Sequence, residues 1–437
     1  MGTALRRARL PDVAAWMAAA FLVCAVFTTN YALALRFDRA AVFSQYNVLF
    51  DADASSRVAC FANGWSSGCR TVVHPNLGNF VNPPIRIAEH ILTQAGFDGV
   101  SPAELRRELS LLIAPMASAL QTGLLVMLFR RLDYNWTSAI ALSALGAVSF
   151  SQMVFGSLPD HFILSGACLA LGLVLVATSA RESRIHWWWW LGLGVVATGI
   201  TITNLIMVGL LLLCAMMASG RGVLRATGHA SAFGLTVLLL TMAMSAALGG
   251  VYEDRAPVSP AVFSDASRKH ELATWVNKYF RSEQDMAEES FPLVAGFSFV
   301  APVPTVVENP LGIKTDARYH VGFSFHNIEN PVSLLIGAGI AFVLGVGAVL
   351  GCLRGLVARA VVAGACAVLG FSWLLHHFWG QEYFLYSQHW NAASVALLGG
   401  MISRSITARM TVVMAIVLTL IVANNFLVID EMFRLLG

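Results

Sequence analysis

The chain has 437 residues, of which 57% are hydrophobic and only 12% are charged. Ordinary soluble domains are about 45–50% apolar and about 25% charged, so this composition excludes a soluble globular enzyme. The formal net charge of +3 comes without any dense tract of lysine and arginine, so nothing in the sequence indicates a nucleic-acid partner.

Apolar runs of about twenty residues recur along the chain, and each can cross about 30 Å of hydrocarbon as a helix. The sequence therefore predicts an all-α integral membrane protein, a polytopic bundle of about eleven transmembrane helices with two large outer loops. The predicted spans are 13–35, 109–129, 136–156, 161–180, 187–203, 205–218, 231–252, 332–353, 360–378, 389–403 and 410–428. The chain divides into a transmembrane module at 1–252 that contains the first outer loop at 36–108, a second outer loop at 253–330, and C-terminal transmembrane helices at 331–437.

Arginines fall on one predicted side of these spans. The short connections on that side carry Arg130, Arg131, Arg181, Arg184, Arg221, Arg225, Arg354, Arg359, Arg404 and Arg409. The short connections on the other side, near Pro159 and at 380–388, carry none. By the positive-inside rule, this predicts a cytoplasmic N-terminus, with both large loops on the outer side of the membrane. We expect the membrane to be a bacterial inner membrane, so that the outer side is the periplasm. The first apolar run is long for the core of a signal peptide, so we interpret it as a retained helix.

The stretch 187–219 is too long for one straight span and short for two full ones. We expect two short helices that meet near Thr203 and Asn204, with one long tilted helix as the alternative. A break in the backbone at membrane depth is tolerated where it is buried in protein or lines a cavity, so this turn is a candidate part of a site. The four tryptophans at 187–190 are typical of an interfacial belt.

The first outer loop contains FDADASSR, residues 50–57, in which Asp51 and Asp53 stand two positions apart. A carboxylate held at the membrane face beside Arg57 can act as a general base on a hydroxyl, while the arginine holds an anionic substrate. The alternative is that these aspartates cap a short helix that begins near Ala54.

The segment HPNLGNFVNPP, residues 74–84, follows in the same loop and is rich in hydrogen-bonding side chains and proline. His74 is a candidate contact for a phosphate or a sugar, with a solvent-facing or structural role as the alternative. The prolines predict a surface helix at about 85–97 that ends at Gly96 or Gly99. Arg86, near the start of that helix, is either a second anion contact or an interfacial side chain that snorkels.

Two further groups of polar residues stand at the outer ends of later spans. GSLPDHFILSG places Asp160 and His161 at the start of the fourth span, where a charge near the bilayer is costly and points to a function, with helix capping as the alternative. GQEYFLYSQHW, residues 380–390, places Glu382, Tyr383 and His389 at the start of the tenth span. This mixture suits a sugar or lipid-phosphate pocket and equally suits an aromatic girdle.

Of the seven cysteines, Cys60 and Cys69 share one polar loop that is predicted to face an oxidising compartment. This pair either forms a disulfide that braces the loop beside FDADASSR or stays as two free thiols. The second outer loop opens with a predicted amphipathic helix at about 265–289. No HExxH, paired CxxC or P-loop signature occurs, so metalloprotease, redox and nucleotide-driven functions lack their usual support.

Taken in order, four of these features resemble the GT-C superfamily of integral membrane glycosyltransferases, which includes the protein O-mannosyltransferases and the lipid A aminoarabinose transferases. They are the first helix with its long outer loop and acidic FDADASSR, the segment HPNLGNFVNPP, the PDHF at the start of a later span, and the broken apolar stretch around Thr203 and Asn204. They cover about the first half of the chain, and GQEYFLYSQHW adds a fifth feature in the second half. Their order and topological side carry the resemblance.

The resemblance implies a GT-C-like fold, a polyprenyl-phosphate-linked sugar as donor and a glycan, lipid or protein as hydroxyl acceptor. Asp53 or Asp51 would deprotonate the acceptor, with inversion at the anomeric carbon. The donor phosphate would be bound by Arg57, His74, Arg86 and His389, and the sugar or acceptor site would be lined by Asn82, Asp160, His161, Asn204, Glu382 and Tyr383. The chain has Asp-Ala-Asp where the family commonly has Asp-Glu, so the choice of base stays open. A requirement for a divalent metal ion also stays open, because some family members use one and others do not.

A transporter or flippase of a lipid-linked sugar is the alternative function, because it would use the same cavity without chemistry. Transporters usually place their polar residues near the middle of the membrane, whereas the candidate residues here stand in outer loops and at the outer ends of helices. A third possibility is an O-antigen ligase or polymerase, for which we expect an arginine-rich outer site. The short outer loops contain no arginine.

Overall fold

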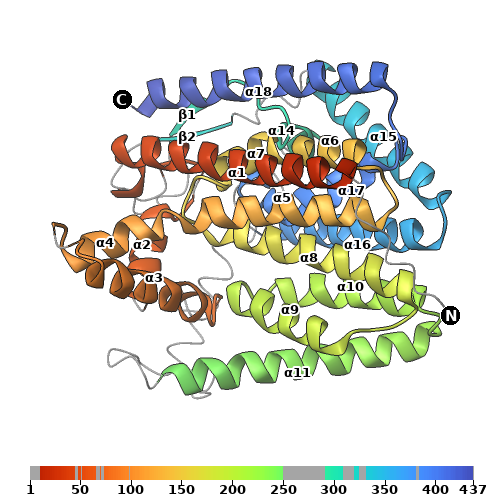
Figure 1. The fold of residues 1–437 in the computed structure, drawn as a ribbon, viewed down its shortest axis with the longest axis horizontal. Helices are drawn as coiled ribbons and strands as arrows, with labels where there is room; N and C mark the ends of the chain where they lie inside the picture. The colour runs from red at the N-terminus through yellow and green to blue at the C-terminus, as the bar shows by residue number, and fades with distance from the viewer. Residues whose placement is uncertain are drawn as a thin grey trace.

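The computed structural model describes residues 10–44, 48–50, 52–64, 69, 73–97, 99–249, 291–308, 319–323, 331–379 and 383–436. Asp51, Glu382 and the helix predicted at 265–289 lie outside these residues, as does the side chain of Tyr383. The described chain is mainly helical, and most of its helices run alongside one another in a bundle (Figure 1).

Six segments are long and apolar enough to cross a membrane. They are α1 (Leu10–Arg39), α4 with α5 (Pro102–Ser110 and Ile113–Arg131), α8 (His161–Glu182), α11 (Val223–Gly249), α16 (Leu356–Phe378) and α18 (Ala408–Leu436). The other helices of the bundle are α6 (Trp136–Ala147), α7 (Phe150–Phe155), α9 (Trp187–Ile200), α10 (Asn204–Ala218), α15 (Pro331–Cys352) and α17 (Gln388–Gly399). The chain is therefore a multi-pass helical membrane protein, in which every predicted apolar run contains a helix. The number of eleven crossings stays a prediction.

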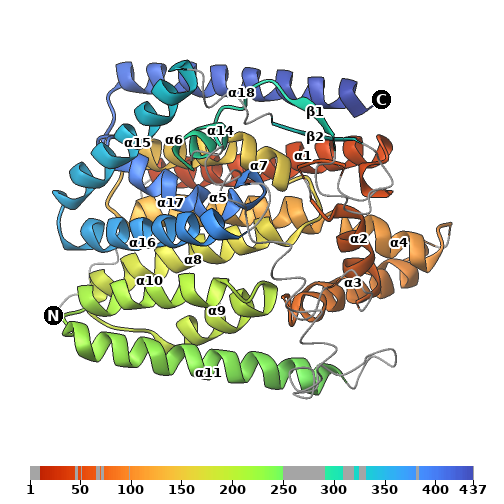
Figure 2. The ribbon, with the colours of Figure 1, turned by 180° about the vertical axis from the view of Figure 1, so that it is seen from behind.

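Helix α8 lies at the centre of the bundle. It packs against α5, α9, α10, α16 and α17, and most of its residues are buried. The large side chains that fill the core include Phe155, Trp190 and Trp390. Helices α1, α11 and α18 lie at the outside (Figures 1 and 2) and expose apolar side chains such as Phe21 and Leu420. Exposed apolar faces of this kind are typical of helices that contact the hydrocarbon of a lipid bilayer.

Charged connections gather at one end of the bundle, which we call the arginine end. Arg181, in the last turn of α8, donates to Asp133, which follows α5, at 2.8 Å. Arg354, after α15, donates to the Tyr134 hydroxyl at 2.6 Å, and Arg404, after α17, donates to the Arg354 carbonyl at 2.9 Å. These contacts bring together four connections that the arginine pattern predicts on one side of the membrane.

The opposite end, which we call the site end, carries the first outer loop and the two described strands of the second loop, whose described helix lies nearer the middle of the bundle (Figures 1 and 2). The first loop folds into α2 (Ala54–Asn63), α3 (Leu77–Gln94) and α4, which pack on one another at the left of Figure 1. The second loop contributes α14 (Phe291–Phe297) and two antiparallel strands, β1 (Thr305–Glu308) and β2 (Tyr319–Gly322). Phe50, just before α2, donates its backbone N–H to Val321 of β2 at 2.9 Å, so the two loops are joined.

Helix α3 differs from the helix predicted at 85–97. It begins at Leu77, and Pro83 and Pro84 lie inside it instead of before it. Leu77 and Val81 are buried in an apolar cluster with α2 and α9, and this burial stabilises the first turns although the prolines remove two backbone donors. The predicted end is confirmed, because α3 stops just before Gly96, whose φ is 87°.

Candidate active site

Arg57 stands at the centre of a buried charged cluster at the site end. It lies in the first turns of α2, and its side chain has no exposed surface. Its Nη2 is 3.5 Å from Asp53 Oδ2, one turn earlier, and its Nε is 3.6 Å from Asp160 Oδ1, just before α8. An isolated buried charge is very costly, so the two carboxylates and the guanidinium make one another's burial possible.

His74 holds Arg57 through a second contact. Its Nδ1 is 2.7 Å from the Ile200 carbonyl oxygen, which can only accept a hydrogen bond, so Nδ1 carries the proton. Its Nε2 is then an acceptor, and Arg57 Nη2 donates to it at 3.0 Å. The imidazole in this tautomer is neutral, so His74 positions the guanidinium and adds no positive charge of its own.

Asp160 and His161 form the third part of the cluster. Asp160 stands at the N-cap of α8, and its Oδ1 accepts from the backbone N–H of His161 at 2.6 Å. The same oxygen is 2.5 Å from His161 Nδ1, so the carboxylate also fixes the imidazole. The ring of His161 lies 4.1 Å from that of His74, between centroids. Helix capping and a place in the cluster, which the sequence presents as alternatives for Asp160, occur together.

Asp53 is the accessible carboxylate of the cluster. Its side chain is 12% exposed, against 1% for that of Asp160. It occupies the N-cap position of α2, yet its side chain makes no capping hydrogen bond. The carboxylate is instead paired with Arg57, so helix capping does not explain why an aspartate stands here. Asp53 therefore keeps some exposed surface, whereas the carboxylate of Asp160 is enclosed by its contacts.

The break between α9 and α10 is hydrogen-bonded to the segment that carries His74. The two helices end and begin within 200–204, as the sequence predicts. The backbone N–H of Asn76 donates to the Gly199 carbonyl at 2.9 Å, and that of Ile202 donates to the Val73 carbonyl at 3.0 Å. The broken backbone is therefore hydrogen-bonded to the segment before α3, which is the condition under which a break at membrane depth is stable.

Aromatic and imidazole rings extend the site from α8 towards α17. The ring of Phe162 lies 4.0 Å from that of His161 and 5.8 Å from that of His389, between centroids. Behind it, His376 of α16 stacks on Tyr386 at 3.7 Å. His389, a predicted phosphate contact, is thus buried one ring beyond His161.

Three other predicted residues have different surroundings. Asn82 donates to two carbonyls at the end of α2, both at 3.0 Å, and so ties α3 to α2. Asn204 donates to Ser165 Oγ at 2.9 Å and to a carbonyl near the end of α9 at 3.0 Å, and so holds the helix break against α8. Arg86 is exposed on α3.

Cys60 and Cys69 form a disulfide, one of the two states that the sequence left open. Both residues are fully buried, and Cys60 lies in α2, three positions after Arg57. The bond therefore braces the helix that carries the central cation of the cluster. The remaining five cysteines are free.

Two residues that contact the charged cluster, Phe162 and Thr201, are not among the site residues predicted from the sequence. Phe162 belongs to the PDHF motif, so the sequence contained a signal for it. Thr201, whose hydroxyl lies 3.2 Å from His74 Nδ1, stands in an apolar run and carries no such signal. Its position depends on where the helix breaks, which only the folded chain defines.

The cluster combines an accessible carboxylate, a fixed cation and two imidazoles. This set suits the removal of a proton from a hydroxyl next to an anionic group. Within the residues that the structure describes, no three His, Cys, Asp or Glu side chains gather as ligands for one metal ion.

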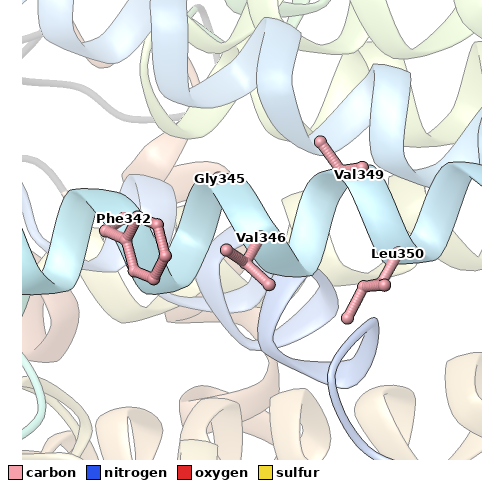
Figure 3. A pocket seen from close by; sticks show the side chains of 5 residues that line it. All are labelled: Phe342, Gly345, Val346, Val349 and Leu350. Carbon is pink, nitrogen blue, oxygen red and sulfur yellow. The ribbon is translucent and has the colours of Figure 1, made fainter.

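A hollow of about 330 Å³ lies elsewhere, on α15 (Figure 3). Its lining is apolar and consists of Phe342, Gly345, Val346, Val349 and Leu350. Phe342 is 71% exposed, as expected for a side chain that faces lipid. This hollow has no group for chemistry and belongs to the outer surface of the bundle.

The charged cluster is assembled from α2, the segment before α3, the turn between α9 and α10, and the start of α8. These elements are up to about a hundred and fifty positions apart in the sequence, between Asp53 and Thr201. No known family model matches the chain, and no curated protein matches it in sequence.

Proposed function

We propose that the protein is a membrane glycosyltransferase that moves a sugar from a polyprenyl-phosphate donor to a hydroxyl of a glycan, lipid or protein at the periplasmic face. The observation that carries this proposal is the ion-pair system of Asp53, Arg57 and Asp160, which is buried except at Asp53. An accessible carboxylate beside a fixed guanidinium is what an acceptor hydroxyl and a lipid phosphate require at one site.

In the proposed reaction, Asp53 takes the proton of the acceptor hydroxyl as its oxygen attacks the anomeric carbon. The bond between that carbon and the phosphate oxygen breaks, and the polyprenyl phosphate leaves with the electron pair. The configuration at the carbon inverts, because the attack and the departure occur on opposite faces. Arg57, held by His74 and Asp160, lies beside the developing phosphate charge, and His161 orients the phosphate or the acceptor.

The proposal also includes the orientation. The site end faces the periplasm and the arginine end faces the cytoplasm, as the positive-inside rule predicts. With a donor that carries its own leaving group, the reaction needs no nucleotide at the site, which agrees with the absence of a P-loop in the sequence.

The test is mass spectrometry of the purified protein in detergent, incubated with a panel of polyprenyl-phosphate sugars and cell-envelope acceptors. Release of free polyprenyl phosphate marks transfer. Loss of a general base typically costs about 10²–10⁴-fold in rate, so we expect Asp53→Asn to lose at least about a hundredfold.

Asp133→Asn is the matched control, because Asp133 is also paired with an arginine but lies at the arginine end. Equal loss in both variants would contradict a special role for Asp53.

Chelation of divalent ions during the same assay decides the metal requirement. If the wild-type protein leaves every donor intact under all conditions, the transferase proposal is wrong, and flux of the lipid-linked sugar across liposomes tests the transporter instead.

A further inference from the structure

A second polar cluster lies inside the bundle, apart from the charges around Arg57. Its members are uncharged and come from two helices. Gln121 of α5 and Gln388 of α17 lie next to Gly166 of α8. His389 follows Gln388 on α17, and its ring lies 5.8 Å from that of Phe162, one turn before Gly166. The two glutamines are fully buried, and His389 is 2% exposed. Gln121 stands in an otherwise apolar helix, whereas Gln388 and His389 belong to the mixed polar and aromatic segment at the start of α17.

Several polar atoms of this cluster lack a partner. Both amide atoms of Gln121, the amide oxygen of Gln388 and both ring nitrogens of His389 have no hydrogen bond within the part of the chain that the structure describes. A buried polar group without a partner destabilises a protein, and hydrocarbon supplies none. Unpartnered amide groups from two helices beside Gly166, with an unpartnered imidazole next along α17, therefore indicate a polar ligand.

Gly166 allows the two amides to approach α8. A Cβ atom at this position would lie 2.6 Å from Gln121 Oε1 and 3.2 Å from Gln388 Oε1. The amide nitrogen of Gln388 donates to Ser151 Oγ at 2.5 Å, which fixes the direction in which its oxygen points. The cluster is therefore held in place before any ligand is present.

The position of the cluster relates it to the charged site. Gly166 lies one helical turn after Phe162 on the same face of α8, and the Phe162 ring is 5.8 Å from that of His389. Five positions separate His161 from Gly166, which corresponds to about 7.5 Å along the helix axis. The uncharged cluster thus lies deeper in the bundle than the charged one, at a distance on the scale of a single sugar ring.

We propose that Gln121, Gln388 and His389 form a subsite for the hydroxyl groups of a neutral sugar. This inference rests on the proposed function, because it assigns the sugar part of the donor to this cluster and the phosphate to Arg57. In this proposal His389 binds the sugar and not the phosphate that the resemblance implies for it. Amide and imidazole groups both donate and accept hydrogen bonds, as hydroxyl groups do. The absence of a charge among the three residues favours a neutral sugar over an acidic or an amino sugar.

The test compares two ligands, polyprenyl phosphate carrying a neutral hexose and bare polyprenyl phosphate, by native mass spectrometry of the purified full chain. We expect the wild-type protein to bind the hexose-bearing lipid at least tenfold more tightly. Gln121→Met and His389→Phe should lose this preference and keep their affinity for the bare lipid. Gly166→Ala should weaken the preference as well, because the added methyl group displaces the amides.

Thermal unfolding without ligand provides the second readout. Gln121→Met should leave the Tm unchanged or raise it, because the amide has no partner to lose. Gln152→Met is the matched control, since Gln152 is equally buried but donates to Ser118 and Thr122, so its Tm should fall.

Two results would overturn the subsite. One is a wild-type protein with no preference for the hexose-bearing lipid. The other is a Gln121→Met variant whose Tm falls as far as that of Gln152→Met and whose preference for the hexose-bearing lipid is unchanged. That result would mean that buried water satisfies the amide. Failure of the proposed transferase looks different, because the preference persists while every donor remains intact.

Discussion

Arg57 is the residue on which the charged cluster depends. It is the only cation among the contacts that join Asp53 and Asp160 in the described chain, and all three groups are largely buried. Removing one partner of a buried ion pair typically costs about 3–5 kcal/mol, because the other charge is left without compensation.

We therefore expect Arg57→Met to lower the free energy of unfolding by about 3–5 kcal/mol and to lower the Tm measured in detergent. Adding Asp160→Asn should recover part of that loss, since it removes one of the two uncompensated carboxylates. A double variant that is less stable than Arg57→Met alone would show that the two side chains act separately.

Arg57→Lys should keep more stability than Arg57→Met but still lose transfer, because one ammonium group cannot replace the contacts that Nε and Nη2 make in two directions.

The disulfide gives a prediction that needs no substrate. Iodoacetamide added to the unreduced, unfolded protein should label the five free cysteines, and two more should react only after reduction. The chemical reason is that Cys60 and Cys69 are covalently joined, whereas the others are only buried or exposed to lipid. Mass spectrometry counts the labels, and seven labels without reductant would contradict the bond.

The sequence names the residues that the structure gathers in the charged cluster, but it does not name the partners that the neutral residues bond to. Asp53, Arg57, His74, Asp160 and His161 are all candidates from their loops, because a charge or an imidazole at the membrane surface needs a partner there. Asn82 and Asn204 differ, because an amide can bond to whichever carbonyl lies nearest. Both bond to helix ends in this structure, and no local pattern specifies those ends.

At the scale of the element, the helix break between α9 and α10 is the feature that joins the membrane part to the first loop. Its length and composition predict two short helices, and the structure confirms them. The contact that fixes the break is tight, because a Cβ at Gly199 would lie 2.5 Å from Phe80 Cε2 and 3.0 Å from Asn76 Cβ. The start of α3 was predicted too late, since packing of Leu77 and Val81 outweighs the local effect of the prolines.

We expect Gly199→Ala to push the segment before α3 away from α9 and to displace His74 from Arg57. Overpacking of this kind costs about 1–3 kcal/mol, so the Tm should fall and transfer should be lost with it. Gly192→Ala is the matched control on the same helix, because a Cβ there meets nothing within 4 Å. Equal behaviour of the two variants would mean that the close approach at Gly199 does not position the site.

At the scale of the whole molecule, the positions of the chain ends constrain the number of crossings. Arg36 near the end of α1 lies 2.6 Å from Asp430 near the end of α18, and the rings of Phe37 and Phe433 are 4.7 Å apart. Both helices therefore end at the site end, and α1 starts at the arginine end. Six crossings would return the chain to the side where it began. The six segments named above do not satisfy this geometry alone, so the other helices of the bundle must add an odd number of crossings.

Reporter fusions test this conclusion. With eleven crossings and a cytoplasmic arginine end, alkaline phosphatase fused after residue 436 should be active in the periplasm, and green fluorescent protein fused there should be dark. A fusion after Ser405, in the connection that Arg404 ties to Arg354, should give the opposite pattern. If the fusion after residue 436 fluoresces and the one after Ser405 is dark, the orientation is inverted, and Asp53 would face the cytoplasm. If both fusions report the same side, α18 does not cross the membrane. The ion pair between Arg36 and Asp430 would then have to form without a membrane-spanning helix between Arg404 and Asp430.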